Sequence, residues 1–208
     1  MSVTHQVLFV CEANICRSAL MEAVFLASMP ADRWRADSAG TDVRVGDRGM
    51  CGISAGVAGC DARSHASAQL TRDRIESSHL VVTASRAVRG EAAALAPGMR
   101  WKIFTLRELN FLAARAPVGE EQPTFAGGSR HVDDLERYAI LLHRRRGLEP
   151  SPTPRWWRLG RKGRSHFFDI GDVHGRKLSV HRSGLEGVVE DVRELGAHLS
   201  AAIPARPS

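Results

Sequence analysis

No run of apolar residues in the sequence is long enough to cross a lipid bilayer, and no charged segment followed by an apolar one begins the chain. A membrane-spanning helix needs about 20 apolar residues, and a secretory leader has that two-part pattern. Cysteine is scarce too, because Cys11, Cys16, Cys51 and Cys60 show neither paired zinc spacing nor a secreted disulfide framework. We therefore expect a cytoplasmic protein with reduced thiols and no metal.

What is present is the composition of an ordinary globular protein. Hydrophobic residues make up 43% and charged residues 25% of the 208-residue chain, which suits one domain over residues 1–208 with length left for an insertion. The net charge of +6 favours anionic partners. Much of that excess lies in the basic runs 143–146 and 155–164. Both belong to an irregular insertion at 115–168, interpreted as a solvated surface. Partial disorder there, or contact of its tryptophans and arginines with nucleic acid or a membrane, remains an alternative.

Short apolar runs alternate with helix-like patterns along most of the chain. The expected strands cover 7–10, 34–38, 80–83 and 101–104, and the expected helices cover 18–28, 51–58, about 67–75, 86–95, 106–114, 132–143 and 185–199. Such alternation predicts right-handed crossovers and a parallel sheet. The predicted fold class is α/β: a single open, mainly parallel four-stranded sheet with helices on both faces, and a long irregular basic insertion before residue 169.

A cysteine and an arginine mark the two ends of a short loop between the first expected strand and the first expected helix. Cys11 ends the apolar run, and Arg17 precedes the helical pattern. Ligands of open α/β sheets bind at this edge, where loop amides and the first turn of a helix attract anions. Arg17 adds a planar pair of donors that fits two phosphate oxygens. The same field stabilises a thiolate, so we expect Cys11 to attack phosphorus rather than to be a buried, inert thiol.

The loop resembles the signature of the low-molecular-weight protein tyrosine phosphatases. Their pattern C-x-G-N-[IT]-C-R-S after an apolar strand is similar to CEANICRS at 11–18. The similarity extends to MEAVF at 21–25 and DSAGT at 37–41, and less specifically to FTLREL at 104–109. The resemblance implies a cofactor-free protein tyrosine phosphatase that hydrolyses phosphotyrosine monoesters through a cysteinyl-phosphate intermediate.

The same resemblance assigns roles to individual residues. Cys16 matches a second family cysteine that forms a reversible disulfide with the nucleophile, although a simple packing role is equally open. Ile15 stands where isoleucine accompanies phosphotyrosine enzymes and threonine accompanies phosphoarginine enzymes. The expected site consists of Cys11, Arg17 and Asp172 as catalytic residues, of Glu12, Ala13, Asn14, Ile15, Cys16, Ser18 and His174 around the substrate, and of Ser38 in support.

Inside the loop, Ser18 is expected to donate a hydrogen bond to the thiolate, while Asn14 and Ser38 hold the loop's shape. Ala13 departs from the glycine that the family often has, and it would be strained if the position required a positive φ. Glu12 at the rim opposes acidic substrates. Reduced activity is therefore an open outcome.

The proton donor is harder to place. In the family an aspartate in a D-P-[YFW] motif protonates the leaving oxygen, and DIGDVHG at 169–175 resembles the surrounding segment. Asp172 is the expected acid, with Val173 and His174 in place of the proline and the aromatic residue. Asp169 is the reserve candidate, and an ordinary turn is the third interpretation. His174 is either a polar loop residue or a group that stacks on the substrate ring.

Two further functions remain open at this stage. Arsenate reductases share the scaffold and the attacking cysteine, but the segment 80–96, where one branch places its relay cysteines, has none. A weakly active phosphate-binding regulatory protein is the other alternative. The expected partners are phosphorylated proteins or aryl phosphates, and the oligomeric state cannot be read from the sequence.

Overall fold

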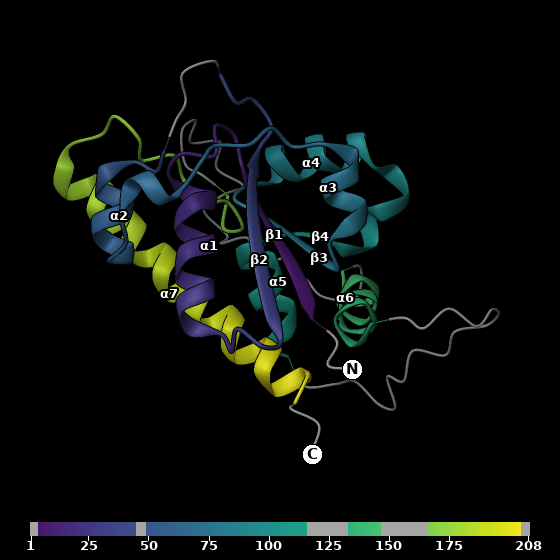
Figure 1. Ribbon diagram of the computed structural model, residues 1–208. Helices are drawn as coiled ribbons and strands as arrows, with labels where there is room; N and C mark the ends of the chain where they lie inside the picture. The colour runs from purple at the N-terminus through teal and green to yellow at the C-terminus, as the bar shows by residue number, and fades with distance from the viewer. Residues whose placement is uncertain (1–3, 45–48, 116–132, 147–165, 205–208) are drawn as a thin grey trace, which may run out of the picture.

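The computed structural model describes residues 4–44, 49–115, 133–146 and 166–204 (Figure 1). In chain order the elements are β1 (His5–Cys11), α1 (Arg17–Ser28), β2 (Trp34–Gly40), α2 (Gly52–Ala58), η1 (Ala62–Ser64), α3 (Arg72–Ser77), β3 (Leu80–Thr83), α4 (Arg86–Leu95), η2 (Pro97–Lys102), β4 (Ile103–Thr105), α5 (Leu106–Ala113), α6 (Asp134–Arg145) and α7 (Leu178–Ala202). Within these ranges no helix is both long enough and apolar enough to span a bilayer.

The four strands form one open sheet in the order β2-β1-β3-β4, and every neighbouring pair is parallel. From β1 the chain crosses to β2 on one side, and it later returns to β3 on the other side. Such a reversal leaves a crevice at the carboxyl ends of the central strands. The loop after β1 therefore starts at the place where α/β proteins bind ligands. The predicted fold class is confirmed.

Alternate residues of β1 pack on opposite faces of the sheet, because successive side chains of a strand point in opposite directions. Phe9 and Val7 belong to a core shared with α1, α5, α6 and α7. Leu8 and Val10 belong to a second core shared with α3 and α4. In Figure 1, α1 and α7 accordingly lie on one side of the sheet, and α3 and α4 lie on the other. Burial on both faces explains why β1 reads as a continuous apolar run.

The helix expected from about residue 67 begins only at Arg72, so this boundary was wrong. Thr71 caps α3 by accepting a hydrogen bond from the Arg74 N–H. The preceding residues instead extend along the edge of β2: Gly40 N–H donates to Ala68 O at 2.8 Å, and Leu70 N–H donates to Gly40 O at 2.7 Å. Sheet pairing therefore overrode the helical pattern of this segment.

The basic run 143–146 is less solvated than expected, because it ends helix α6. Arg145 is buried and donates to Leu112 O at 2.9 Å. Arg146 pairs with Glu108 at 3.1 Å and stacks on the Phe104 ring at 3.9 Å. Residues 116–132 and 147–165 lie outside the described residues. The expectations of disorder and of nucleic-acid or membrane contact at 155–164 therefore concern a part of the chain that the structure does not describe.

Candidate active site

The loop between β1 and α1 is built around Asn14, which is fully buried. Its φ is 56°, and it is the only non-glycine residue with a positive φ among those described. Asparagine tolerates this left-handed conformation better than most residues. Ala13 is not among the residues with positive φ, so the strain considered for the alanine does not arise.

Hydrogen bonds at both ends of Asn14 fix the loop to its surroundings. Its carbonyl oxygen accepts from His65 Nε2 at 2.8 Å and from Ser67 Oγ at 3.0 Å, while its side-chain Oδ1 accepts from Ala68 N–H at 2.8 Å. Its side-chain Nδ2 donates to Ser18 Oγ at 2.9 Å and to Ser38 Oγ at 2.8 Å. One side chain thus joins the loop to α1, β2 and the segment before α3.

The hydrogen bonds from Asn14 also determine which acceptors the hydroxyl protons of Ser18 and Ser38 can reach. Ser18 Oγ accepts from Asn14, so its own proton is available to Cys11 Sγ, which lies 2.9 Å away. Ser38 Oγ likewise accepts from Asn14 and donates to Glu22 Oε2 at 2.6 Å. The expected hydrogen bond from Ser18 to the thiol of Cys11 is thus geometrically available.

Two charged groups face each other at the pocket. Arg17 is the first residue of α1 and is buried, and its Nη2 lies 3.4 Å from Asp172 Oδ2. Its Nη1 donates to Ile170 O at 3.4 Å. Ile170 N–H in turn donates to Ala84 O, just beyond β3, at 2.8 Å. The segment that carries Asp172 is therefore docked on the carboxyl end of the sheet.

Asp169 has different neighbours. Its carboxylate accepts from the Arg86 N–H at 2.8 Å and lies 3.3 Å from the Arg86 guanidinium. Its backbone oxygen accepts from Arg107 Nη1 at 3.1 Å. Asp169 is absent from the pocket lining, whereas Asp172 is part of it. Of the two expected acids, Asp172 is therefore the one that shares the pocket with Cys11.

A pocket of about 250 Å³ opens at this end of the sheet, and its walls combine expected and unexpected residues. The lining consists of Cys11, Glu12, Ala13, Ile15, Cys16, Arg17, Asp42, Arg44, Asp172 and His174. Asn14, Ser18 and Ser38 are buried and do not line the pocket. Asp42 and Arg44, which form an ion pair at 3.6 Å, were missed by the sequence reasoning. Their only signal was their position just after β2, the strand next to β1.

Cys16 and His174 belong to a second group of side chains beside the pocket. His174 Nδ1 lies 3.2 Å from Cys16 Sγ, and His181 Nε2 lies 3.8 Å from the same sulfur and 3.9 Å from Cys51 Sγ. Burial, together with the neighbouring Cys51, raises the pKa of Cys16 to about 12. Burial and the adjacent His174 lower the pKa of His181.

Comparison with known proteins identifies the architecture around this pocket. A model of the family described as low molecular weight phosphotyrosine protein phosphatase matches residues 6–143, which include the loop and all of the sheet except its first residue, His5. The chain belongs to this family. It is therefore a phosphatase. No curated protein sequence gives a significant match.

Solved structures of phosphatases have the same fold. A YwlE mutant from Bacillus subtilis is 17% identical with a TM-score of 0.61, over 95% of this chain and 99% of that one. A low molecular weight protein tyrosine phosphatase from T. tengcongensis is 21% identical with a TM-score of 0.59, over 92% and 97%. The YwlE arginine phosphatase from Geobacillus stearothermophilus is 18% identical with a TM-score of 0.58, over 98% and 99%. At these identities the likeness concerns the fold.

Proposed function

We propose that this phosphatase hydrolyses phosphotyrosine monoesters in proteins through a cysteinyl-phosphate intermediate. The observation that carries the proposal is the convergence of Cys11, Arg17 and Asp172 on one pocket, with Ser18 Oγ 2.9 Å from the Cys11 sulfur. A nucleophile, a bidentate phosphate ligand and a proton donor are the groups that such a transfer requires.

In the first step the Cys11 thiolate attacks phosphorus, and the ester P–O bond breaks. Asp172 gives its proton to the leaving phenolic oxygen, while Arg17 binds two equatorial oxygens of the phosphoryl group. In the second step a water molecule attacks the phosphocysteine and gives its proton to Asp172. Inorganic phosphate leaves, and the thiolate is regenerated with a hydrogen bond from Ser18.

Tyrosine specificity rests on Ile15, which lines the pocket. Its apolar side chain suits an aromatic ring better than a charged guanidinium. Solved structures with the same fold include arginine phosphatases, so both substrates belong in the test. We expect a higher kcat/KM for phosphotyrosine peptides than for phosphoarginine peptides. We also expect Ile15→Thr to reduce the ratio of kcat/KM for phosphotyrosine to kcat/KM for phosphoarginine. A preference of the unmodified protein for phosphoarginine, or a ratio that Ile15→Thr leaves unchanged, would contradict the tyrosine assignment.

The decisive experiment uses the Cys11→Ser protein. Removal of the thiol should abolish hydrolysis of an aryl phosphate, because serine is a much weaker nucleophile at neutral pH. The variant should still bind substrate, so it should retain phosphotyrosine proteins from a cell extract. Persistent turnover would exclude the cysteinyl-phosphate route. Reducing conditions in the cytoplasm, the proposed compartment, would keep Cys11 available as a thiol.

Arsenate reduction is a second candidate, favoured by one observation. Cys51 lies beside Cys16, although it is distant in sequence, so a thiol pair exists next to the pocket. In such a reaction two thiols would be oxidised to a disulfide while arsenate is reduced to arsenite. Thiol-dependent formation of arsenite that is lost in Cys51→Ser, without ester hydrolysis, would support this function over the phosphatase.

A further inference from the structure

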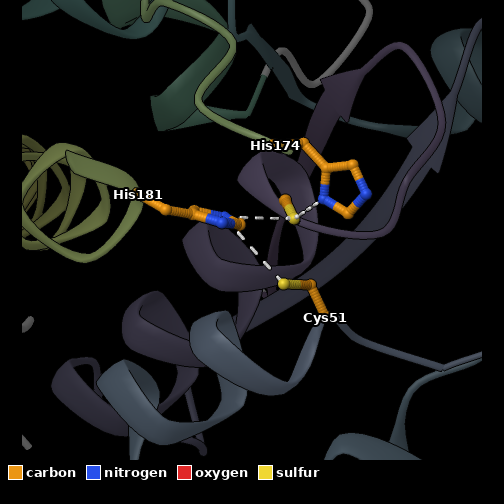
Figure 2. Close-up of side chains that lie close together, drawn as sticks. Cys51, His174 and His181 are labelled. Atoms are coloured by element: carbon orange, nitrogen blue, oxygen red, sulfur yellow. Dashed lines mark hydrogen bonds between the residues drawn. The ribbon is translucent and has the colours of Figure 1, made fainter. Parts of the chain in front are cut away.

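Four side chains from distant segments meet beside the phosphate loop. Cys16 precedes α1, Cys51 precedes α2, His174 lies in the loop after Asp172, and His181 lies in the first turn of α7. One atom from each, two sulfurs and two imidazole nitrogens, lies within 4.8 Å of all the others. Figure 2 shows the labelled side chains of Cys51, His174 and His181 pointing toward one another from separate parts of the chain.

The spacing of these atoms approaches that of a tetrahedral zinc site. Zn–S bonds of about 2.3 Å and Zn–N bonds of about 2.0–2.1 Å put the ligand atoms about 3.3–3.8 Å apart. The observed separations of 3.2 Å (Cys16 to His174), 3.8 Å (Cys16 to His181) and 3.9 Å (Cys51 to His181) fall close to that interval. Since no pair exceeds 4.8 Å, small side-chain movements would complete the geometry.

We propose that Cys16, Cys51, His174 and His181 together bind one Zn²⁺ ion. Two thiolates and two neutral imidazoles form one of the common ligand sets of structural zinc, and four protein ligands leave no open position for a substrate. Binding transfers no electrons, and any proton held by the two thiols is released to solvent. The site departs from the expectation of a metal-free protein.

His181 gives the strongest support. It is buried at 3% exposure, and the side-chain hydrogen bonds that the described residues provide to it come from the sulfurs of Cys16 and Cys51. A buried imidazole normally has a hydrogen-bond partner, and sulfur atoms 3.8 and 3.9 Å away are weak ones. Cys51 and His181 also lie outside the catalytic pocket lining, so the proposed phosphoryl transfer gives them no task.

The location gives the ion a structural role in catalysis. His174 stands two residues after Asp172, and Cys16 is adjacent to Arg17 in the loop. One ion bound to both would fasten the segment that carries the acid to the loop that carries the nucleophile. While its sulfur is bound to zinc, Cys16 cannot form a disulfide with Cys11. Zinc binding and oxidation of Cys11 and Cys16 to a disulfide therefore exclude each other.

The test is a zinc titration of the full chain. The protein is first reduced and freed of metal with a chelator, and it then competes for Zn²⁺ with a chromophoric chelator. We expect one ion per chain. Cys51→Ser and His181→Asn should each weaken zinc affinity by more than about 10-fold. A loss of about 10-fold is the lower limit for residues that only hydrogen-bond to a metal ligand, and a ligand itself should matter more. Co²⁺ in the same site should show thiolate-to-metal charge transfer and the absorption of a tetrahedral ion.

Three matched variants serve as controls. Cys60→Ser and His198→Asn change a cysteine and an α7 histidine outside the cluster and should keep the ion. Cys11→Ser should also keep it, which excludes zinc bound to the pocket thiol. Failure of the unmodified chain to bind one ion overturns the proposal, whether or not a variant folds. Equal loss in Cys60→Ser, or loss only in Cys11→Ser, overturns it as well. None of these measurements depends on phosphatase activity, so the two proposals fail separately.

Discussion

The guanidinium of Arg17 and the carboxylate of Asp172 lie 3.4 Å apart, the first buried at the start of α1 and the second half-exposed in the loop before α7. A half-exposed ion pair contributes little to stability. Substitution of Asp172 should therefore report on chemistry rather than on folding. Both side chains line the pocket, so this ion pair holds the proposed acid at the proposed phosphate site.

We expect Asp172→Asn to lower the kcat for an aryl phosphate by about 10²–10⁴-fold, because the leaving oxygen loses its proton donor. Inhibition by inorganic phosphate should be equal or stronger, since a negative charge leaves the anion site. The matched control is Asp169→Asn, which breaks the contacts with Arg86 and should lower the melting temperature with a smaller loss of kcat. The reverse order of the two effects would make Asp169 the acid.

Asn14 offers a test of the loop's support. Asn14→Gly keeps the left-handed backbone but removes the side-chain hydrogen bonds, and it should lower the free energy of unfolding by about 1–3 kcal/mol. Asn14→Ala loses the same bonds and adds the strain of a Cβ at positive φ, about 1 kcal/mol more. Urea denaturation of both variants measures the difference. If Asn14→Ala is no less stable than Asn14→Gly, the backbone conformation described for this loop is incorrect.

Substitution of two glycines of α7 distinguishes an effect on helix stability from a steric clash with the loop that carries Asp172. A Cβ at Gly184 would lie 2.8 Å from a methyl group of Val173, whereas a Cβ at Gly187 would meet no atom within 4 Å. Gly187→Ala should stabilise the protein by about 0.5–1 kcal/mol with unchanged turnover. Gly184→Ala should displace Val173 and slow turnover. Identical kinetics in the two variants would show that Val173 does not position Asp172.

The contact between His5 and Asp133 predicts a pH dependence of stability. The side chain of Asp133 is buried; it lies 2.9 Å from His5 Nδ1 and accepts a hydrogen bond from the N–H of Leu135. Burial opposes ionisation, but these hydrogen bonds and the nearby His79 hold the pKa of Asp133 below its ordinary value of 3.8. The carboxylate therefore stabilises the fold fully above 3.8, and this contribution is lost as the pH falls through the lowered value.

Asp133→Asn should accordingly lower the free energy of unfolding at neutral pH by about 1.5–3 kcal/mol, the range for hydrogen bonds to charged groups. The difference from the unmodified protein should shrink in acid below the lowered pKa. Denaturant melts across this range, with the exposed Asp32→Asn as the control, measure it. A difference independent of pH would assign the effect to packing instead.

Much of the fold could be predicted because local patterns and tertiary pairing agree in it. The strand β3 and the helix α4 have the expected bounds, because β3 is a short, fully buried apolar run and Ser85 caps the start of α4. The segment 67–71 could not be predicted, because its pairing with Gly40 is a long-range contact that no local pattern reveals. β4 begins later than expected, since Trp101 and Lys102 belong to the 3-10 helix η2, which begins at Pro97.

The candidate site likewise contains residues that could be predicted from the sequence and residues that could not. The loop at 11–18 is contiguous, so its residues could be named in advance. Cys51 and His181 could not, because their neighbours lie in other segments and neither has a spacing typical of a metal motif. Asp42 and Arg44 were missed for a related reason: a residue reaches this pocket through the order of the strands, which the sequence does not state directly.

The short stretch that carries Asp172 is held at both of its ends. Before it, Asp169 is bound to α4 and α5, and Ile170 is bound to the end of β3 and to Arg17. After it, His174 touches Cys16. Only a few residues between these attachments are left to move when a phosphoprotein enters or phosphate departs, so we expect anchoring, rather than a large swinging flap, to set the reach of the acid. We therefore expect substrates with bulky surroundings to be limited by how they fit past this anchored segment.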